Sequence, residues 1–187
     1  MSKAAELAKF IGTDISISSG VVTFANPPIG LPKLLSSQAT TSGTSKDFTV
    51  PTGTKIIYVL TDSLSHSGSN SNFQIQLGTS GGIVSSGYTS TVAFTGGGST
   101  EGGNVGTSTS SFLFYYSAAS GDTASGIIMI VNQTGNVYSY SAECKSGNYV
   151  SNAAGKVDLG AAVTTVRVGT ADDRTLDGGV VNVMCIQ

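Results

Sequence analysis

Apolar and polar positions alternate along most of the chain, and this pattern predicts a β-rich domain from about residue 46 to residue 187. Phe73, Ile75 and Leu77, for example, are separated by single polar residues, as in a strand with one buried face. Stretches rich in Gly, Ser, Thr and Asn separate the apolar runs and predict turns. The predicted strands are 47–50, 56–60, 73–77, 88–94, 112–116, 127–131, 137–145, 156–159, 163–168 and 180–186. No helical pattern lies between them, so we expect an all-β fold, an antiparallel β-sandwich of jelly-roll type.

Four of these predicted strands, 56–60, 112–116, 127–131 and 180–186, are apolar at nearly every position. Residues 127–131 read Ile-Ile-Met-Ile-Val, and 180–186 read Val-Val-Asn-Val-Met-Cys-Ile. Such runs are typical of strands that are covered on both faces, whereas a small sandwich buries only one face of each sheet. We therefore expect the second face to be covered by an arm or by a neighbouring subunit.

The start of the chain has a different pattern. Residues 4–11 contain strong helix formers, with Leu7, Phe10 and Ile11 on one stripe and Gly12 where a helix would stop. A helix of this length is too short to persist alone in water, so it needs a surface to pack on. The three apolar residues of the stripe are the predicted assembly contacts.

The rest of this segment predicts an extended connection. Residues 21–24 match a short strand, Pro27 and Pro28 then interrupt regular structure, and residues 36–45 have the composition of a linker. The sequence thus predicts an N-terminal arm with a short helix at 1–45, which serves attachment and assembly, and a β-sandwich domain at 46–187.

Composition limits the classes of function. The chain has 187 residues, a net charge of −2 and no basic stripe, so nucleic acid is not an expected partner. It contains no apolar run of 18 residues that would predict a membrane span. The N-terminus lacks the apolar stretch of a secretory signal, so we expect synthesis in a cytoplasm and buried thiols, not a disulfide, at Cys144 and Cys185.

Side chains suited to catalysis are sparse. His66, Asp62 and Ser63 form the one possible acid–base cluster, but all three lie close together in one predicted turn where nothing fixes a tautomer. We interpret His66 as a solvated turn residue, and we predict no catalytic residue, no cofactor and no enzymatic activity.

Aspartates near the C-terminus raise the alternative of a Ca²⁺ site. Asp172, Asp173 and Asp177, with Asp158, supply hard oxygen ligands, but their spacing does not match an EF-hand loop. Aspartates in turns commonly bond the backbone or pair with an arginine. We predict no metal here, and the Ca²⁺ alternative stays open at this stage.

Two predicted loops are candidates for contact with other molecules. Residues 65–71 include His66 and Asn70, and the glycine-rich stretch 96–111 includes Asn104, Ser108 and Ser110. Hydroxyl and amide groups suit weak hydrogen bonding to sugars, and many copies on one particle would add avidity. We therefore expect any contact with a host-surface glycan to use these loops.

Several segments resemble bacteriophage virion surface proteins of the tail-fibre or receptor-binding type. The opening strand–turn–strand Phe-Thr-Val-Pro-Thr-Gly-Thr-Lys-Ile at 48–56 resembles many tail-fibre domains, and residues 3–9 resemble the start of such proteins. Residues 60–65, the Gln-Leu-Gly at 76–78 and the Ser-Gly-Tyr at 86–88 are similar to a family found in marine phages. The C-terminal Val-Arg-Val at 166–168, two aspartates and Leu-Asp-Gly-Gly-Val-Val-Asn-Val-Met at 176–184 also match, with Leu176 where that pattern has phenylalanine.

The resemblance implies a structural protein of a virion that is made in the host cytoplasm. It favours a tail fibre or receptor-binding protein that forms a homotrimer and contacts other virion proteins. A capsid decoration protein of the same virion class is the alternative. A carbohydrate-binding module is the second alternative, although such modules typically present a tryptophan platform and this chain has no tryptophan.

Overall fold

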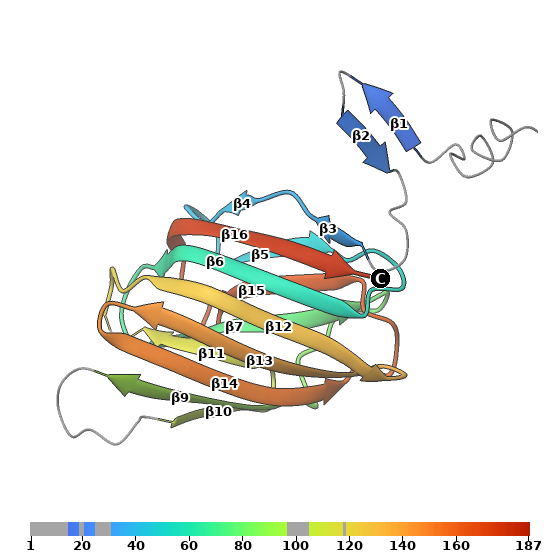
Figure 1. Ribbon diagram of the computed structural model, residues 1–187. Helices are drawn as coiled ribbons and strands as arrows, with labels where there is room; N and C mark the ends of the chain where they lie inside the picture. Colours follow the sequence, from blue (N-terminus) through green and yellow to red (C-terminus); the bar gives the residue numbers. More distant parts are fainter. Residues whose placement is uncertain (1–14, 19–20, 25–30, 97–104, 118) are drawn as a thin grey trace, which may run out of the picture.

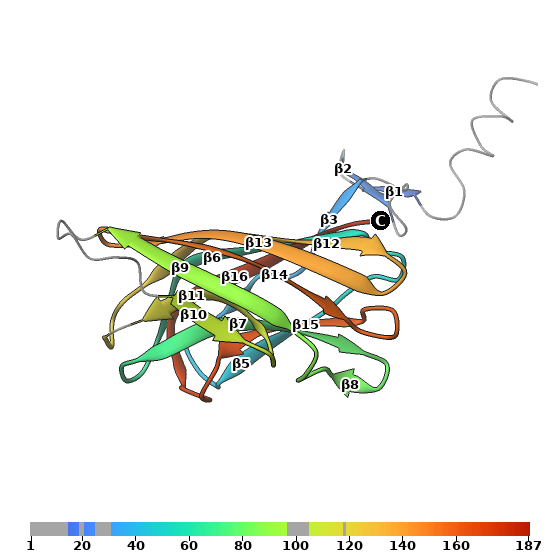
Figure 2. The same cartoon turned by 90° about the horizontal axis from the view of Figure 1, so that it is seen from below.

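A computed structural model describes residues 15–18, 21–24, 31–96, 105–117 and 119–187, and all regular structure in these residues is β-strand. The strands form two packed antiparallel sheets and a separate hairpin (Figures 1 and 2). The hairpin consists of β1 (Ile15–Ser18) and β2 (Val21–Phe24), which pair only with each other in the sheet topology. The prediction of an antiparallel all-β sandwich is confirmed.

The large sheet has nine strands and lies in front in Figure 1. In spatial order they are β10 (Val105–Ser108), β9 (Thr89–Gly96), β14 (Tyr149–Asp158), β13 (Val137–Ser146), β12 (Ala124–Thr134), β6 (Ile56–His66), β16 (Leu176–Ile186) and β3 (Pro32–Leu34). The short β4 (Gln38–Ala39) also pairs with β16.

The small sheet has five strands and packs behind the large sheet. Its order is β11 (Phe112–Ser117), β7 (Ser71–Thr79), β15 (Thr165–Thr170) and β5 (Ser45–Thr49), with β8 (Gly82–Ile83) paired to β7. Along the chain, successive strands cross repeatedly between the sheets: β5, β7, β11 and β15 belong to the small sheet, and β6, β12 and β16 to the large one.

One hydrophobic core fills the space between the sheets. Alternate residues of β6 and β12, such as Val59 and Ile128, are fully buried on this inner side. They face aromatic residues of β7 and β11, where Phe73 stacks on Phe114 with 5.9 Å between ring centroids. In strands that alternate in sequence, the apolar residues therefore face this core and the residues between them face the outer surfaces.

The N-terminal boundary differs from the prediction. The predicted helix at 4–11, with Leu7, Phe10 and Ile11, lies outside the described residues. The chain joins the large sheet well before residue 46, because β3 and β4 both pair with β16. Thr40 is fully buried, and its hydroxyl donates a hydrogen bond to the carbonyl of Gly178. Residues 36–45, whose composition resembles that of a linker, thus lie at an edge of the sandwich.

Three local predictions also need correction. Residues 65 and 66 continue β6, so the turn before β7 is shorter than the predicted loop 65–71. The predicted loop 96–111 contains β10, which pairs with β9. The predicted strand 156–159 is the end of the ten-residue β14, whose Ala, Gly and Asn residues gave no strand signal. Pairing with β13 and β9 on both sides imposes the extended form there.

The turns separate into two ends of the sandwich. The connections β5–β6, β12–β13 and β14–β15 lie near Pro32 and the C-terminus. Ile56, at the start of β6, pairs with Ile186, and Ile186 pairs with Pro32. We call this the terminal end. The β6–β7, β13–β14 and β15–β16 turns lie at the opposite end, which we call the distal end.

Candidate functional site

Three strands at the middle of the large sheet are apolar on the side that faces away from the core. Their register forms three rows across β16, β6 and β12. The rows are Ile186–Ile56–Val131, Met184–Tyr58–Met129 and Asn182–Leu60–Ile127. Every position except Asn182 is apolar, and we call these nine residues the apolar outer face.

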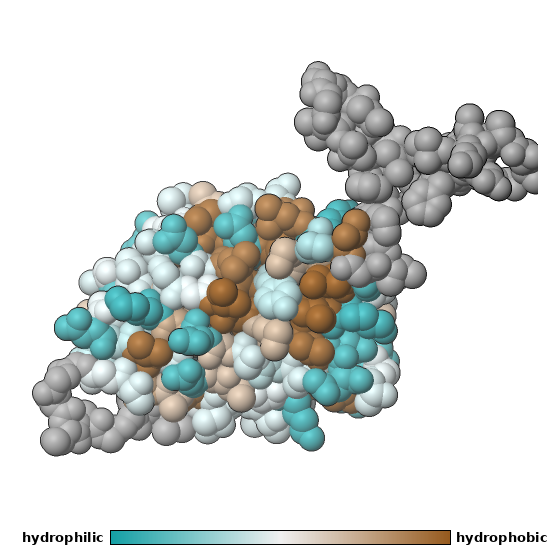
Figure 3. Space-filling view, viewed as in Figure 1, coloured by the Kyte–Doolittle hydropathy of each residue, from teal (hydrophilic) through white to brown (hydrophobic). Residues whose placement is uncertain are grey.

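The apolar outer face has a polar border on one side and an apolar neighbour on the other. On the next strand, β13, the three rows continue into Ser139, Ser141 and Glu143. On the other side, Leu34 of β3 pairs with Met184 and is 64% exposed. Figure 3 shows apolar side chains gathered over this part of the sheet, with hydrophilic side chains around them.

The surface beside the apolar outer face is hollowed. One shallow depression of about 420 Å³ is lined by Ile127, Met129 and residues of β13 and β14, and a second of about 310 Å³ continues past Gly126 to Val150. Ile127 borders both depressions and is 52% exposed. The apolar outer face is therefore bordered by depressions that side chains of a partner could fill.

The outward side of the small sheet is polar. Its central strand β7 presents Asn72, Gln74 and Gln76, and β15 presents Arg167. The guanidinium of Arg167 forms two hydrogen bonds to the carboxylate of Asp47, which raise the pKa of the arginine. Outer sheet faces in sandwiches are normally polar, so the small sheet follows the usual pattern and the large sheet departs from it.

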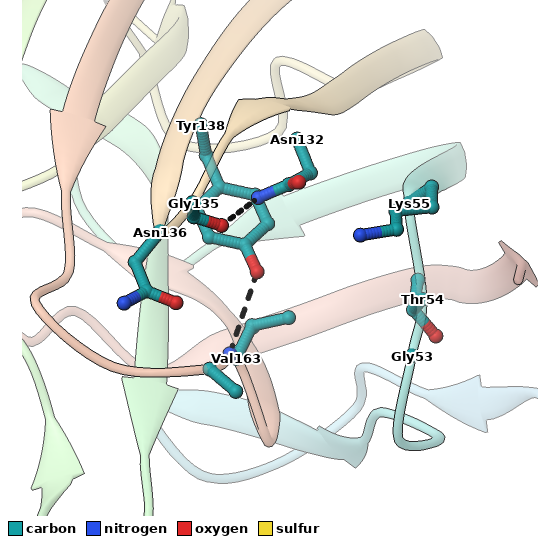
Figure 4. Close-up of a pocket in the computed structure, with 9 residues that line it drawn as sticks. Gly53, Thr54, Lys55, Asn132, Gly135, Asn136, Tyr138 and Val163 are labelled. Carbon is teal, nitrogen blue, oxygen red and sulfur yellow. Dashed lines mark hydrogen bonds between the residues drawn. The ribbon is translucent and has the colours of Figure 1, made fainter.

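A separate polar hollow of about 180 Å³ lies at the terminal end (Figure 4). The β5–β6, β12–β13 and β14–β15 connections line it with Lys55, Asn132, Asn136 and Tyr138. The Asn132 amide is held by the carbonyl of Gly135, and the Tyr138 hydroxyl accepts from the backbone N–H of Val163. Lys55 is the one charged side chain of this lining, so the hollow suits a small anionic or hydroxylated group.

The predicted contact residue His66 is buried, which corrects its interpretation as a solvated turn residue. It is the last residue of β6, is 0% exposed, and packs edge-on against Phe73 at 5.1 Å between ring centroids. Its Nδ1 lies 3.2 Å from the carbonyl oxygen of Ser67. Asp62 and Ser63, the other members of the predicted cluster, are exposed and hydrogen-bonded to each other. The cluster therefore does not form an acid–base site.

The other predicted contact residues fall at opposite ends of the sandwich. Asn70 lies at the distal end with a positive φ of 58° and accepts a hydrogen bond from the hydroxyl of Tyr116. Ser108 and Ser110 lie toward the terminal end, where the Ser108 hydroxyl accepts from the backbone N–H of Ser110 and stabilises the turn. Asn104 lies outside the described residues. The structure thus does not bring these residues together.

The four aspartates do not converge either. Asp172 accepts hydrogen bonds from Ser71 and Arg174, Asp177 accepts from Ser65, and the Asp158 carboxylate accepts from the backbone N–H of Gly160. Burial acts to raise the pKa of Asp172, but its hydrogen bonds and the nearby Arg174 guanidinium outweigh that effect and lower the pKa overall. Within the described part of the chain, no three acidic, histidine or cysteine side chains are grouped as metal ligands.

Both cysteines are free and buried in the core, as predicted. Burial raises the pKa of the Cys144 thiol to about 12 and that of Cys185 to about 11. A thiol at such a pKa is protonated at neutral pH and is a poor nucleophile. Neither cysteine is therefore suited to covalent catalysis.

The comparisons with known proteins leave the function open. No protein-family model matches the chain, and no curated protein is detectably similar to it. Among solved structures, the VP2 subviral particle of infectious bursal disease virus aligns at 12% identity with a TM-score of 0.11. The alignment covers 92% of this chain and 44% of the VP2 chain. A TM-score this low supports no conclusion on fold or function. The described residues contain no helix that is long and apolar enough to cross a membrane.

Proposed function

We propose that this chain is a structural protein of a bacteriophage virion, a tail fibre or receptor-binding protein that self-associates and projects its β-domain. The observation that supports it most is the apolar outer face on β16, β6 and β12. Such a face on the central strands of a sheet is typical of an interaction surface. The resemblance of residues 48–56 and 176–184 to phage fibre proteins directs the proposal to a virion.

We also infer that the two sheets follow a jelly-roll topology. The order β3/β4–β16–β6–β12 in the large sheet and β5–β15–β7–β11 in the small one supports this assignment. The strands β9, β10, β13 and β14 extend the large sheet beyond this eight-strand arrangement. Jelly rolls are common in viral capsid and lectin domains, so the topology agrees with a virion protein that self-assembles or binds sugars.

Self-association as a homotrimer is the oligomeric form we propose. Homo-oligomers generally close by symmetry, and a closed assembly would cover the apolar outer face in every copy. Light scattering should then give three times the 18.8 kDa mass of one chain. A single-chain mass at micromolar concentration would contradict the proposal.

Labelling of intact particles tests the position in the virion. Antibodies against this chain should bind at the tail of negatively stained particles. Label spread evenly over the capsid would overturn the tail assignment and favour a capsid decoration protein. Particles that lack the chain altogether would overturn the virion assignment.

A further inference from the structure

The β1–β2 hairpin has an apolar face of its own. Directly paired residues lie on the same face of a two-stranded sheet, and successive residues alternate between faces. The register pairs Ile15 with Phe24 and Ile17 with Val22, so these four positions share one face. The opposite face holds the pairs Ser16–Thr23 and Ser18–Val21. The hairpin is thus amphipathic by position.

Within the described residues, the hairpin has no strand neighbour beyond its own two strands. In the sheet topology it forms a two-stranded sheet apart from the two main sheets. An isolated two-stranded hairpin is at best marginally stable in water, because it has nothing against which to bury its apolar side. A second apolar surface is therefore needed, and the apolar outer face of the large sheet is the exposed apolar surface described above.

We propose that the β1–β2 hairpin of one copy docks, by the face that holds positions 15, 17, 22 and 24, on the apolar outer face of a second copy. The inference rests on the self-association proposed above and specifies the surfaces that make it. Each copy would donate one hairpin and receive one, so the contact is heterologous and generates a ring when the rotation closes.

The two surfaces agree in size. The apolar outer face runs from Ile56 to Leu60 along β6 and across three strands, or about 13 Å by about 15 Å at ordinary strand spacings. A hairpin of four residue pairs spans three residue intervals, about 10 Å, and is about 10 Å wide with its side chains. The hairpin therefore fits within the apolar outer face.

The position of the hairpin favours a second copy over its own domain. In both views the hairpin stands beyond the corner where β3 begins, away from the face itself (Figures 1 and 2). Leu34, close to where the chain enters the sandwich, is also exposed and pairs with Met184 of the same face.

Matched substitutions on the two faces of the hairpin test the proposal in the full chain. Ile17→Asp places a charge on the apolar side, whereas Thr23→Asp places the same charge on the polar side. On the sheet, Ile127→Asp is the test and Ser141→Asp on the neighbouring strand is its control. We expect Ile17→Asp and Ile127→Asp each to reduce the mass in light scattering to the 18.8 kDa of one chain. The two controls should keep the wild-type mass, and circular dichroism should show all four variants folded.

Cross-linking identifies which chain contributes the hairpin. Val22→Cys and Met129→Cys are made in two copies with tags of different length, mixed, and treated with a short bismaleimide. The native thiols are buried and should not react. A cross-linked product that contains both tags is the expected result. In a chain that carries both substitutions, an intramolecular link at high dilution would overturn docking between copies.

The outcomes separate this inference from the proposed function. If the wild-type chain is oligomeric and Ile127→Asp dissociates it but Ile17→Asp does not, the face mediates assembly and the hairpin is not its occupant. If neither substitution changes the mass of an oligomeric wild type, both the hairpin and the face are excluded. A monomeric wild-type chain would overturn self-association itself.

Discussion

Tyr140 joins the two sheets by hydrogen bonds as well as by packing. Its hydroxyl donates to the carbonyl of Leu113 at 2.7 Å and contacts the Ser90 hydroxyl at 2.7 Å, while Ser90 accepts from the backbone N–H of Leu113. Tyr140 and Ser90 belong to the large sheet, whereas Leu113 belongs to β11 of the small sheet. The ring of Tyr140 also stacks on Phe112, 4.2 Å away between centroids. A small polar network therefore fixes how the sheets sit on each other.

We predict that Tyr140→Phe destabilises the domain while keeping its fold. The ring stacking survives, but the buried carbonyl of Leu113 loses its donor, so the free energy of unfolding should fall by about 1–3 kcal/mol. Tyr116→Phe is the matched control, because the Tyr116 hydroxyl bonds Asn70 at an exposed position, and it should change stability by about 0.5 kcal/mol or less. Urea denaturation measures both. Equal losses for the two variants would contradict the role of the network.

Buried tyrosine and cysteine side chains, which lose a proton at high pH, make the fold sensitive to alkaline pH. Burial raises the pKa of Tyr88 and Tyr140 from 10.0 to about 12, and that of Cys144 from 9.0 to about 12. These groups lose their protons earlier in the unfolded chain than in the folded one, so their contribution is complete below about pH 8 and is lost as the pH rises toward 12.

The melting temperature should accordingly be level from pH 7 to about 8 and fall progressively from about pH 8 to 11. Differential scanning calorimetry in buffers of constant ionic strength measures this. The Cys144 thiol should also stay unreactive toward Ellman's reagent at pH 8 until the protein is unfolded by urea. Rapid reaction of both thiols in the folded protein would contradict the burial that causes the shifts.

At the scale of single elements, the sequence predicts strands well where apolar residues set the period. β7 and β13 alternate clearly because each has one face in the core. β10 and all but the end of β14 were missed, since small and polar residues fill them and only their neighbours in the sheet hold them extended. β3 and β4 were missed for a related reason: they are edge strands whose hydrogen bonds to β16 leave no apolar pattern in their own sequence.

The candidate interaction surface was predicted in part. The apolar runs on 127–131 and 180–186 led us to expect a covered second face, and the register locates that face on β16, β6 and β12. The run at 56–60 in β6 is equally apolar, but the sequence could not show that β6 lies between the other two strands, because neighbours in a sheet are set by long-range pairing. For the same reason, the burial of His66 became visible only once Phe73 and β6 were placed together.

Truncation separates the arm from the sandwich. Deletion of residues 1–30 leaves every strand of both main sheets in place, so the melting temperature should stay within about 2 °C of that of the dissociated Ile17→Asp chain. Deletion of residues 1–45 also removes β3 and β4, which exposes the edge of β16 and breaks the bonds from the backbone N–H groups of Leu35 and Thr40 to Val183 and Gly179. At about 1 kcal/mol for each lost bond, together with the uncovered edge, stability should fall by about 3 kcal/mol or more. Equal stability of the two truncated chains would place the boundary at residue 46 after all.

At the scale of the whole molecule, the two outer faces and the two ends differ in character. The outer side of the large sheet is apolar at its centre, and that of the small sheet is polar. The N-terminal entry at Pro32 and the C-terminus share the terminal end, close to the β12–β13 turn, whereas the β13–β14 turn lies at the distal end (Figure 1). A chain that is attached through its N-terminal segment would therefore hold its distal end outward.

An epitope inserted into turns at the two ends tests this orientation on assembled particles. Insertion at Gly147, in the β13–β14 turn, should leave assembly intact and be accessible to antibody on whole particles, because this turn lies at the distal end. The same epitope at Gly135, in the β12–β13 turn, should be accessible on the free protein but several-fold less so on particles, because it lies at the attached end. Both glycines are turn residues with positive φ and no neighbouring atoms close to where a Cβ would lie, so the two insertions should perturb the local structure to a similar extent. Equal antibody binding to both epitopes on intact particles would show that the terminal end does not face the virion.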